Sequence, residues 1–205
     1  MTDLVGVILA GGQGTRMGGV DKGLLSLGPH CILDEVIARL APQVDRMVLN
    51  ANGDPGRFSR FGLPVIADSL TGFLGPLAGV LAGMEWARGT GAQWIVTVAA
   101  DTPFFPHDLA SRCREACQHG APIALAATAD ATGTWHRHPT FGLWHVDTAE
   151  SLRTALADGL RKIVRWTDAE GGVEVRFEQS IADPFFNVNT PDELQIATTL
   201  LGRIP

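Results

Sequence analysis

The sequence lacks the features that mark several classes of protein. No apolar run approaches the roughly 20 residues that a membrane helix needs, so no transmembrane segment is expected. The first residues contain no basic region followed by a cleavage motif, so they do not predict a signal peptide. Only three cysteines occur in 205 residues, which favours a reducing, cytoplasmic location over a disulfide framework. Cys113 and Cys117 are expected to be buried thiols, because no second pair of metal ligands lies nearby.

Basic residues are outnumbered by acidic ones. The chain has 16 lysines and arginines against 22 aspartates and glutamates, and its net charge is −6 at pH 7. An extended nucleic-acid interface needs a basic surface, so neither nucleic acid nor a membrane is expected as a partner. A small anionic ligand is still compatible with this charge, because backbone N–H groups and a few cations can hold phosphate on an acidic protein.

Short apolar runs alternate with helical patterns along the whole chain. This alternation predicts an α/β fold in which helices cover both faces of a mostly parallel sheet. No repeat, low-complexity tract or linker interrupts it, so residues 1–205 are expected to form a single domain. The predicted strands are 5–9, 46–50, 63–67, 94–100, 123–128, 140–146 and 173–177. The predicted helices are 32–40, 75–88, 106–118, 148–156, 160–166 and one that begins at Thr190-Pro-Asp-Glu, a sequence typical of a helix start.

A glycine-rich segment, residues 9–24, follows the first predicted strand. Its glycines let the backbone turn tightly and present N–H groups to an anion, and Arg16 and Lys22 add two cations. The segment is not a P-loop, because Val20 stands where that motif requires lysine. It is not a dinucleotide-binding fingerprint either, because Met17 stands where a third small residue is needed.

Polar residues also follow three later predicted strands, at Asn50, Asp68 and Asp101. Ligands of open parallel sheets gather at the carboxyl ends of the strands. These side chains are therefore candidate ligand contacts, although each is also compatible with an ordinary turn, loop or helix cap.

The glycine-rich segment is similar to the signature L-A-G-G-x-x-x-R-M-G-G-x-D-K-G-L of the molybdenum cofactor guanylyltransferases, within the nucleotidyltransferase superfamily. Gly12 favours guanylyl over cytidylyl transfer, because the cytidylyl relatives usually carry Ala-Ala-Gly there. Two positions depart from the family pattern: many relatives carry a basic residue at Gln13, and some carry arginine at Gly53. Further matches extend over nearly the whole chain, at Val48–Asn52, Gly75–Gly79, Asp101–Pro103, His138–Thr140 and Phe186–Pro191.

The resemblance implies a three-layer, Rossmann-like nucleotidyltransferase fold and a specific reaction. GMP would pass from GTP to molybdopterin, forming molybdopterin guanine dinucleotide and releasing pyrophosphate, with Mg²⁺ as cofactor. Arg16, Lys22 and Asp101 are the implied catalytic residues; Arg16 would meet the triphosphate and Asp101 would bind the metal. The implied nucleotide contacts are Leu9, Ala10, Gly11, Gly12, Lys22, Asn50, Asp68 and Asp101. Because the nucleophile and the leaving group are both anionic, such transfer depends on positioning and on offsetting charge.

The acceptor side of the site is less well defined. Residues 135–139 are predicted to form a polar loop, in which His136 and Arg137 are candidates for contact with the pterin or a second metal. Asn187 and Asn189 lie two residues apart and would share a face of an extended segment. They are candidates for the same contacts, and both pairs are equally compatible with a solvated loop or turn.

Alternative functions follow from the same features. The nearest are cytidylyl transfer to molybdopterin and guanylyl transfer to a sugar phosphate. In a different class, a non-catalytic GTP-binding protein could deliver the cofactor, although it would not need the complete set of Arg16, Lys22 and Asp101. The resemblance implies contact with proteins that donate molybdopterin and with molybdoenzymes that accept the product, and the sequence leaves monomer and weak oligomer open.

Overall fold

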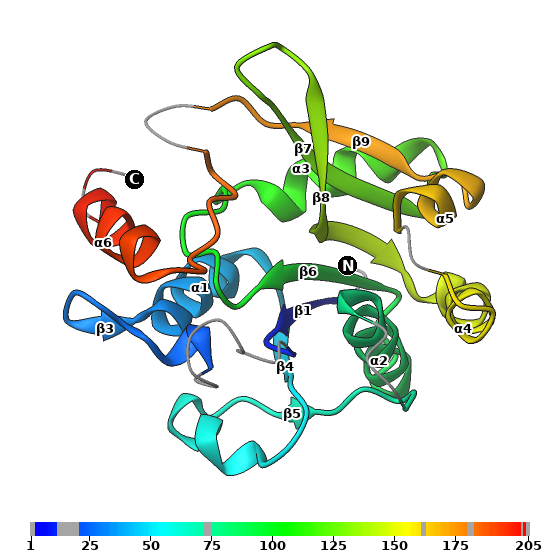
Figure 1. The fold of residues 1–205 in the computed structure, drawn as a ribbon. Coiled ribbons are helices and arrows are strands. Elements are labelled where there is room, and N and C mark those ends of the chain that lie inside the picture. Colours follow the sequence, from blue (N-terminus) through cyan, green and yellow to red (C-terminus); the bar gives the residue numbers. More distant parts are fainter. Residues whose placement is uncertain are drawn as a thin grey trace.

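A seven-stranded sheet forms the centre of the computed structural model, which describes residues 3–11, 21–71, 75–160, 163–179, 183–201 and 203 (Figure 1). The strand order is β5-β4-β1-β6-β8-β7-β9. The strands are β1 (Leu4–Leu9), β4 (Arg46–Asn50), β5 (Val65–Ile66), β6 (Trp94–Ala99), β7 (Ile123–Ala129), β8 (Trp135–His145) and β9 (Val173–Arg176). Strand β8 runs antiparallel to both of its neighbours, and the other pairs are parallel. The prediction of a mostly parallel sheet is confirmed.

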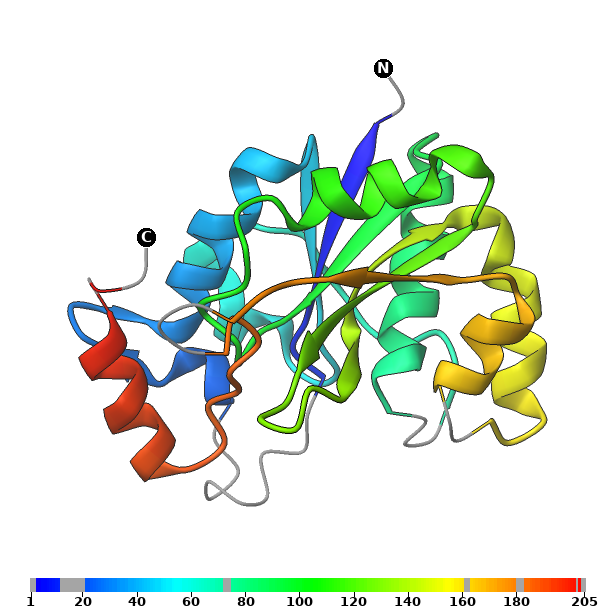
Figure 2. The same cartoon turned by 90° about the horizontal axis from the view of Figure 1, so that it is seen from above.

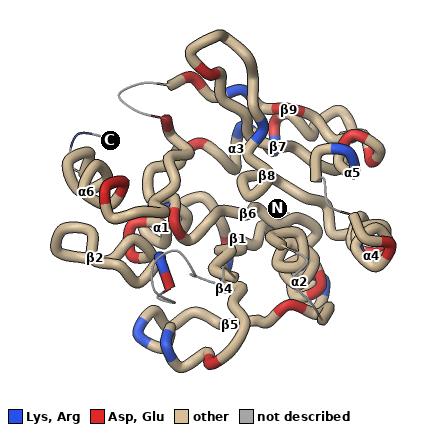
Figure 3. The backbone as a smooth tube through the Cα atoms, in the orientation of Figure 1, with Lys and Arg blue, Asp and Glu red and all other residues tan. Residues whose placement is uncertain are grey.

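Helices cover both faces of this sheet (Figure 1). A small hairpin of β2 (Ser26–Leu27) and β3 (His30–Cys31) lies beside the C-terminal helix, as Figures 1 and 2 both show. The helices are α1 (Ile32–Leu40), α2 (Pro76–Gly89), α3 (Leu109–Ala116), α4 (Ala149–Ala157), α5 (Ile163–Ala169) and α6 (Pro191–Leu200). None of the helices within the described ranges is both long enough and apolar enough to cross a membrane. Lysines and arginines are interspersed with aspartates and glutamates along the described chain (Figure 3).

Strand β1 is apolar on both faces, and successive side chains enter different cores. Leu4 and Ile8 join the core under α1 and α3, whereas Val5, Val7 and Leu9 join the core under α2 and α4. Side chains alternate between the faces of a strand, so a continuous apolar run is what a strand covered on both sides requires. The three-layer arrangement therefore follows directly from this stretch of sequence.

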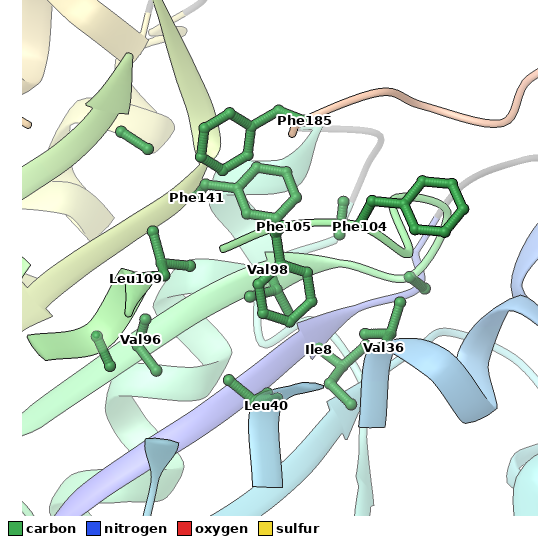
Figure 4. Packing of buried hydrophobic residues seen from close by; sticks show 14 of the residues in the cluster. Ile8, Val36, Leu40, Val96, Val98, Phe104, Phe105, Leu109, Phe141 and Phe185 are labelled. Atoms are coloured by element: carbon green, nitrogen blue, oxygen red, sulfur yellow. The ribbon is translucent and has the colours of Figure 1, made fainter. Parts of the chain in front are cut away.

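The larger core joins α1 to the middle of the sheet. Figure 4 shows Ile8 of β1 and Val98 of β6 packed with Val36 and Leu40 of α1 and with Phe105. All five are fully buried. This packing fixes the ends of β1 and β6, from which the candidate site residues extend.

Several predicted boundaries differ from the observed ones by a few residues, and the largest difference is at the start of β8. The polar sequence 135–139 is the first part of strand β8, not a loop before it. Asp130 accepts hydrogen bonds from the backbone N–H groups of Thr132 and Thr134, which closes a tight turn, so β8 pairs with β7 from Trp135 onward. The register shifts where Pro139 lies, which is where a residue without an N–H is tolerated in a strand.

His138, in this part of β8, generates a prediction about stability and pH. Its ring stacks on Phe185 at a centroid distance of 4.4 Å and lies 2.7 Å from the Thr128 hydroxyl, and burial lowers the pKa of the imidazole. Protonation of the imidazole is thus less favourable in the folded protein than in the unfolded chain, which binds more protons at acidic pH. We expect the free energy of unfolding to decrease as the pH falls below about 6.5, the pKa of an unperturbed histidine.

The variant His138→Phe retains the ring stacking and removes this titrating group, so its stability should depend less on pH. Urea unfolding of both proteins between pH 5 and pH 8 measures the difference. Parallel pH profiles for the two proteins would contradict the role given to His138.

Candidate functional site

The candidate site lies at the carboxyl ends of four parallel strands. Leu9 of β1 pairs with Asn50 of β4 on one side and with Ala99 of β6 on the other, and Asn50 pairs with Ile66 of β5. The backbone of Ala10 extends this ladder, because its N–H donates to Asn50 O at 2.9 Å. The glycine-rich segment therefore leaves the sheet between the polar residues that follow β4 and β6. Gly12, Gln13 and Arg16 of this segment lie outside the described residues.

Lys22 approaches two oxygen-bearing side chains from distant parts of the chain. Its Nζ atom lies 3.3 Å from Asp101 Oδ2 and 2.5 Å from Asn189 Oδ1. The backbone packs closely beside Lys22, since a Cβ atom on Gly23 would lie 3.2 Å from the carbonyl oxygen of Ala100. The lysine and the aspartate are each about a quarter exposed, so both can still be reached by a ligand.

The segment that carries the two asparagines is fixed at both ends. The N–H of Val188 donates to Asp101 O at 2.8 Å, and the Thr102 hydroxyl donates to Asn187 Oδ1. On the other side, the N–H of Asn189 donates to Glu193 Oε2 in the first turn of α6. Both asparagines thus lie near Asp101: Asn187 bonds to the neighbouring Thr102, and Asn189 bonds to Lys22.

A second polar group joins β4 to the residues after β5. Asn50 is buried, and its Nδ2 atom donates to Asp68 Oδ1 at 3.0 Å and to Ile66 O at 3.3 Å. Asn52 bonds to Asp68 twice: its Nδ2 donates to Asp68 Oδ2 at 2.8 Å, and its Oδ1 accepts from the Asp68 N–H at 2.9 Å. The carboxylate of Asp68 is therefore held by an amide on each oxygen.

The sequence Gly75–Gly79 has a steric role beside this group. Gly75 precedes helix α2 with φ +74°, a conformation that favours glycine, and Pro76 begins the helix. A Cβ atom on Gly79 would lie 2.2 Å from Asn50 Oδ1 and 2.9 Å from Leu9 Cδ2. The absence of a side chain at Gly79 lets α2 pack directly against the ends of β1 and β4.

Arg57 connects the two polar groups. Its Nε atom donates to Asp21 Oδ2 at 2.5 Å, beside Lys22, and its Nη2 atom donates to Asn52 O at 2.7 Å. Gly53, one of the departures from the family pattern, has φ +85° in the turn between them, where a residue with a Cβ atom would be strained. Sequence reasoning assigned no role to Asn52, Arg57 or Thr102, although Asn52 and Thr102 lie within quoted motifs.

His136 and Arg137 make their described contacts elsewhere. His136 Nε2 lies 2.7 Å from Asp130 Oδ2 in the β7–β8 turn. Arg137 pairs with Asp168 of α5 and with Glu174 of β9, and these bonds raise the pKa of its guanidinium. Among the described residues, these contacts do not join either residue to the group around Asp101.

The chemistry of the donors around Asp101 fits magnesium. The described residues contain no cluster of three or more histidine, cysteine, aspartate or glutamate side chains that could hold a metal alone. The group around Asp101 instead offers one carboxylate together with the amide oxygens of Asn187 and Asn189. Mg²⁺ prefers oxygen ligands and is commonly bound by one or two carboxylates together with substrate phosphates.

The close packing at Gly79 generates a prediction. Gly79→Ala should decrease the free energy of unfolding by about 1–3 kcal/mol, the usual cost of overpacking, because the new methyl group must displace Asn50 or Leu9. Gly89→Ala in the same helix is the matched control, since a Cβ atom there meets nothing within 4 Å. Denaturant unfolding should show the loss for Gly79→Ala alone, and equal stabilities of the two variants would contradict the steric role.

Comparison with known proteins gives the chain its relatives. Residues 6–172 match the family model described as the MobA-like NTP transferase domain. A molybdenum cofactor guanylyltransferase of Mesorhizobium japonicum is 50% identical, and the match covers 97% of this chain and 96% of the relative. Another, of Nitrobacter hamburgensis, is 46% identical over 95% of this chain and 93% of the relative.

Solved structures share the fold at lower identity. Molybdopterin-guanine dinucleotide biosynthesis protein A from Archaeoglobus fulgidus superposes with a TM-score of 0.73 at 22% identity, covering 98% of this chain and 99% of the other. The 4-diphosphocytidyl-2C-methyl-D-erythritol synthase of Anaerococcus prevotii has a TM-score of 0.74 at 13% identity, with the same coverage. The predicted nucleotidyltransferase fold is confirmed.

Proposed function

The chain belongs to the MobA-like NTP transferase family and is a nucleotidyltransferase, and from this premise we propose that it transfers GMP from GTP to molybdopterin. The product would be molybdopterin guanine dinucleotide, and the second product pyrophosphate. The observation that carries the proposal is the meeting of Lys22, Asp101 and Asn189 at the strand ends beside the glycine-rich segment. This arrangement suits a nucleoside triphosphate, which needs a cation and oxygen ligands for a metal on its phosphates.

The residues around Asp101 are proposed to act on the phosphates. An oxygen of the molybdopterin phosphate attacks the α-phosphorus of GTP, and the bond from that phosphorus to the pyrophosphate oxygen breaks. Lys22 offsets negative charge on the phosphates, together with Arg16, which lies outside the described residues. The backbone of residues 9–12 is proposed to contact the nucleotide. Because the Ala10 N–H already donates to Asn50 O, the N–H groups for the phosphates are expected from Gly11 onward. Positioning and charge compensation then account for most of the catalysis.

A divalent metal ion is general among NTP transferases, and we propose Mg²⁺ in this one, with Asp101 as its carboxylate ligand and Asn187 or Asn189 as candidate amide ligands. When bound, Mg²⁺ supplies charge neutralisation on the phosphate oxygens. Lys22 contacts both Asp101 and Asn189, so the cation and these ligands are held within reach of the same phosphates.

The group around Asp68 is proposed to recognise the base. Guanine carries two adjacent donors, N1–H and the 2-amino group, and a carboxylate offers two parallel acceptors to such a pair. Cytosine and adenine have no such adjacent pair. Asp68 is half-buried and has one amide donor on each oxygen, so each oxygen retains capacity for a further bond. This chemistry favours guanylyl over cytidylyl transfer.

The proposed partners are GTP, molybdopterin, and the proteins that donate molybdopterin or accept the dinucleotide. The acceptor contacts of His136 and Arg137 stay a prediction, and the described partners of Arg137 give them no support. The three cysteines are free and buried, which fits a reducing location such as the cytoplasm.

A transfer assay tests the proposed function. Purified protein is incubated with molybdopterin, Mg²⁺ and either GTP or CTP, and pyrophosphate and the dinucleotide are measured. We expect product with GTP only. Product with CTP instead would overturn the assignment of the base, and binding of GTP without product would favour a cofactor-delivery protein.

Asp101→Asn tests the metal ligand in the same assay. The substitution preserves the shape of the side chain and removes its charge, so we expect turnover to fall about 10²–10³-fold, as for removal of one preorganised charge-stabilising group. Asp147→Asn is the control, because that side chain is 78% exposed beside α4. The segment that carries Asn187 and Asn189 is held by a hydrogen bond to the backbone carbonyl of Asp101. The substitution does not change this bond, so the fold should be retained. Turnover equal to that of the control would remove Asp101 from the metal site.

A further inference from the structure

Asn52 has no role in the reaction as described so far, yet both hydrogen bonds described for its side chain are made to Asp68. We propose that Asn52 is a positioning residue that holds the Asp68 carboxylate in the orientation that recognises guanine, and so contributes to base specificity. The inference rests on the proposed function and deepens it.

The two bonds of Asn52 hold different parts of the same residue. Its Oδ1 atom accepts from the backbone N–H of Asp68 at 2.9 Å, and its Nδ2 atom donates to the carboxylate at Oδ2, at 2.8 Å. Asn50 donates to the other carboxylate oxygen at 3.0 Å. Rotation of the carboxylate about its Cβ–Cγ bond would break one or both of these side-chain bonds. Loss of Asn52 would leave the carboxylate held only by Asn50.

Asn52 is itself fixed from both sides. The N–H of Ala51 donates to Ile66 O at 2.9 Å, which continues the pairing of β4 with β5. On the other side, Arg57 donates to Asn52 O at 2.7 Å while its Nε atom holds Asp21. Arg57 thus links the turn at Gly53 to Asp21, the residue that precedes Lys22. Through Asn52 and Arg57, Asp68 is therefore connected to the segment that carries the proposed phosphate-binding cation.

A purely structural role for Asn52 is the weaker explanation. The side chain is exposed, and a hydrogen bond between exposed groups replaces bonds to water with little gain in folding free energy. Asp68 could close a turn without a second amide on its carboxylate. Recognition of the two adjacent donors of guanine requires a carboxylate whose two oxygens are both held in place. The two amides on Asp68 provide this arrangement.

A double-mutant cycle on the full chain tests the inference. The dissociation constants of GTP and of inosine triphosphate, which keeps N1–H and lacks the 2-amino group, are measured for the wild type, Asn52→Ala, Asp68→Ala and the double variant. We expect Asn52→Ala to weaken GTP binding about tenfold, as for the loss of one charge-assisted hydrogen bond between Asp68 and the base. Binding of inosine triphosphate should weaken less, so discrimination between the two nucleotides should fall. In the Asp68→Ala background, Asn52→Ala should have no further effect.

Asn52→Asp is the isosteric second variant. It keeps the acceptor for the Asp68 N–H and places a carboxylate against Asp68 Oδ2, so GTP binding should be at least as weak as for Asn52→Ala. Thermal unfolding of each variant confirms that it is folded. An unchanged GTP dissociation constant for Asn52→Ala would overturn the inference, as would equal losses for both nucleotides that persist without Asp68. A CTP dissociation constant measured for the wild type in parallel tests the proposed function separately, since that function fails if the wild type binds CTP and not GTP.

Discussion

The pairing of Leu9 with Asn50 on one side and Ala99 on the other is the constraint on which the candidate site depends. These pairings place the ends of β4, β1 and β6 level, so that the residues following each strand meet at one edge. A shift of one residue in this register would turn every side chain to the opposite face of the sheet. The burial of β1 on both faces opposes such a shift, because Ile8 and Val7 would then each enter the core that the other now occupies.

Two polar groups are built on this edge, and each uses a carboxylate that is already partnered. Asp101 faces a lysine and an amide-bearing segment, whereas Asp68 lies between two asparagines. Because the carboxylates are fixed before any ligand arrives, less ordering remains to be done on binding. Arg57 joins the two groups through Asp21 and the backbone of Asn52, so it links the proposed base contacts to the proposed phosphate contacts.

The 4-diphosphocytidyl-2C-methyl-D-erythritol synthase of Anaerococcus prevotii shares this fold at 13% identity. The fold therefore does not specify the base or the acceptor, and specificity has to come from a few side chains mounted on it. In this chain we propose that task for Asp68 and the two asparagines that bond to it. The site also needs the close approach of α2, which Gly79 permits by leaving room for Asn50.

The sequence by itself determined the α/β class, the limits of α1 and β4, and the strand-end positions of Asn50 and Asp101, because apolar periodicity and helix caps are local signals. The same local signals failed at 135–139, where polar residues continue a strand because a tight turn pairs it with β7. Only the tertiary structure brought Lys22 to Asn189, 167 positions away, and gave Arg137 its partners on α5 and β9. Such contacts depend on how the helices and strands pack together. Composition and residue spacing do not reveal which distant residues this packing brings into contact.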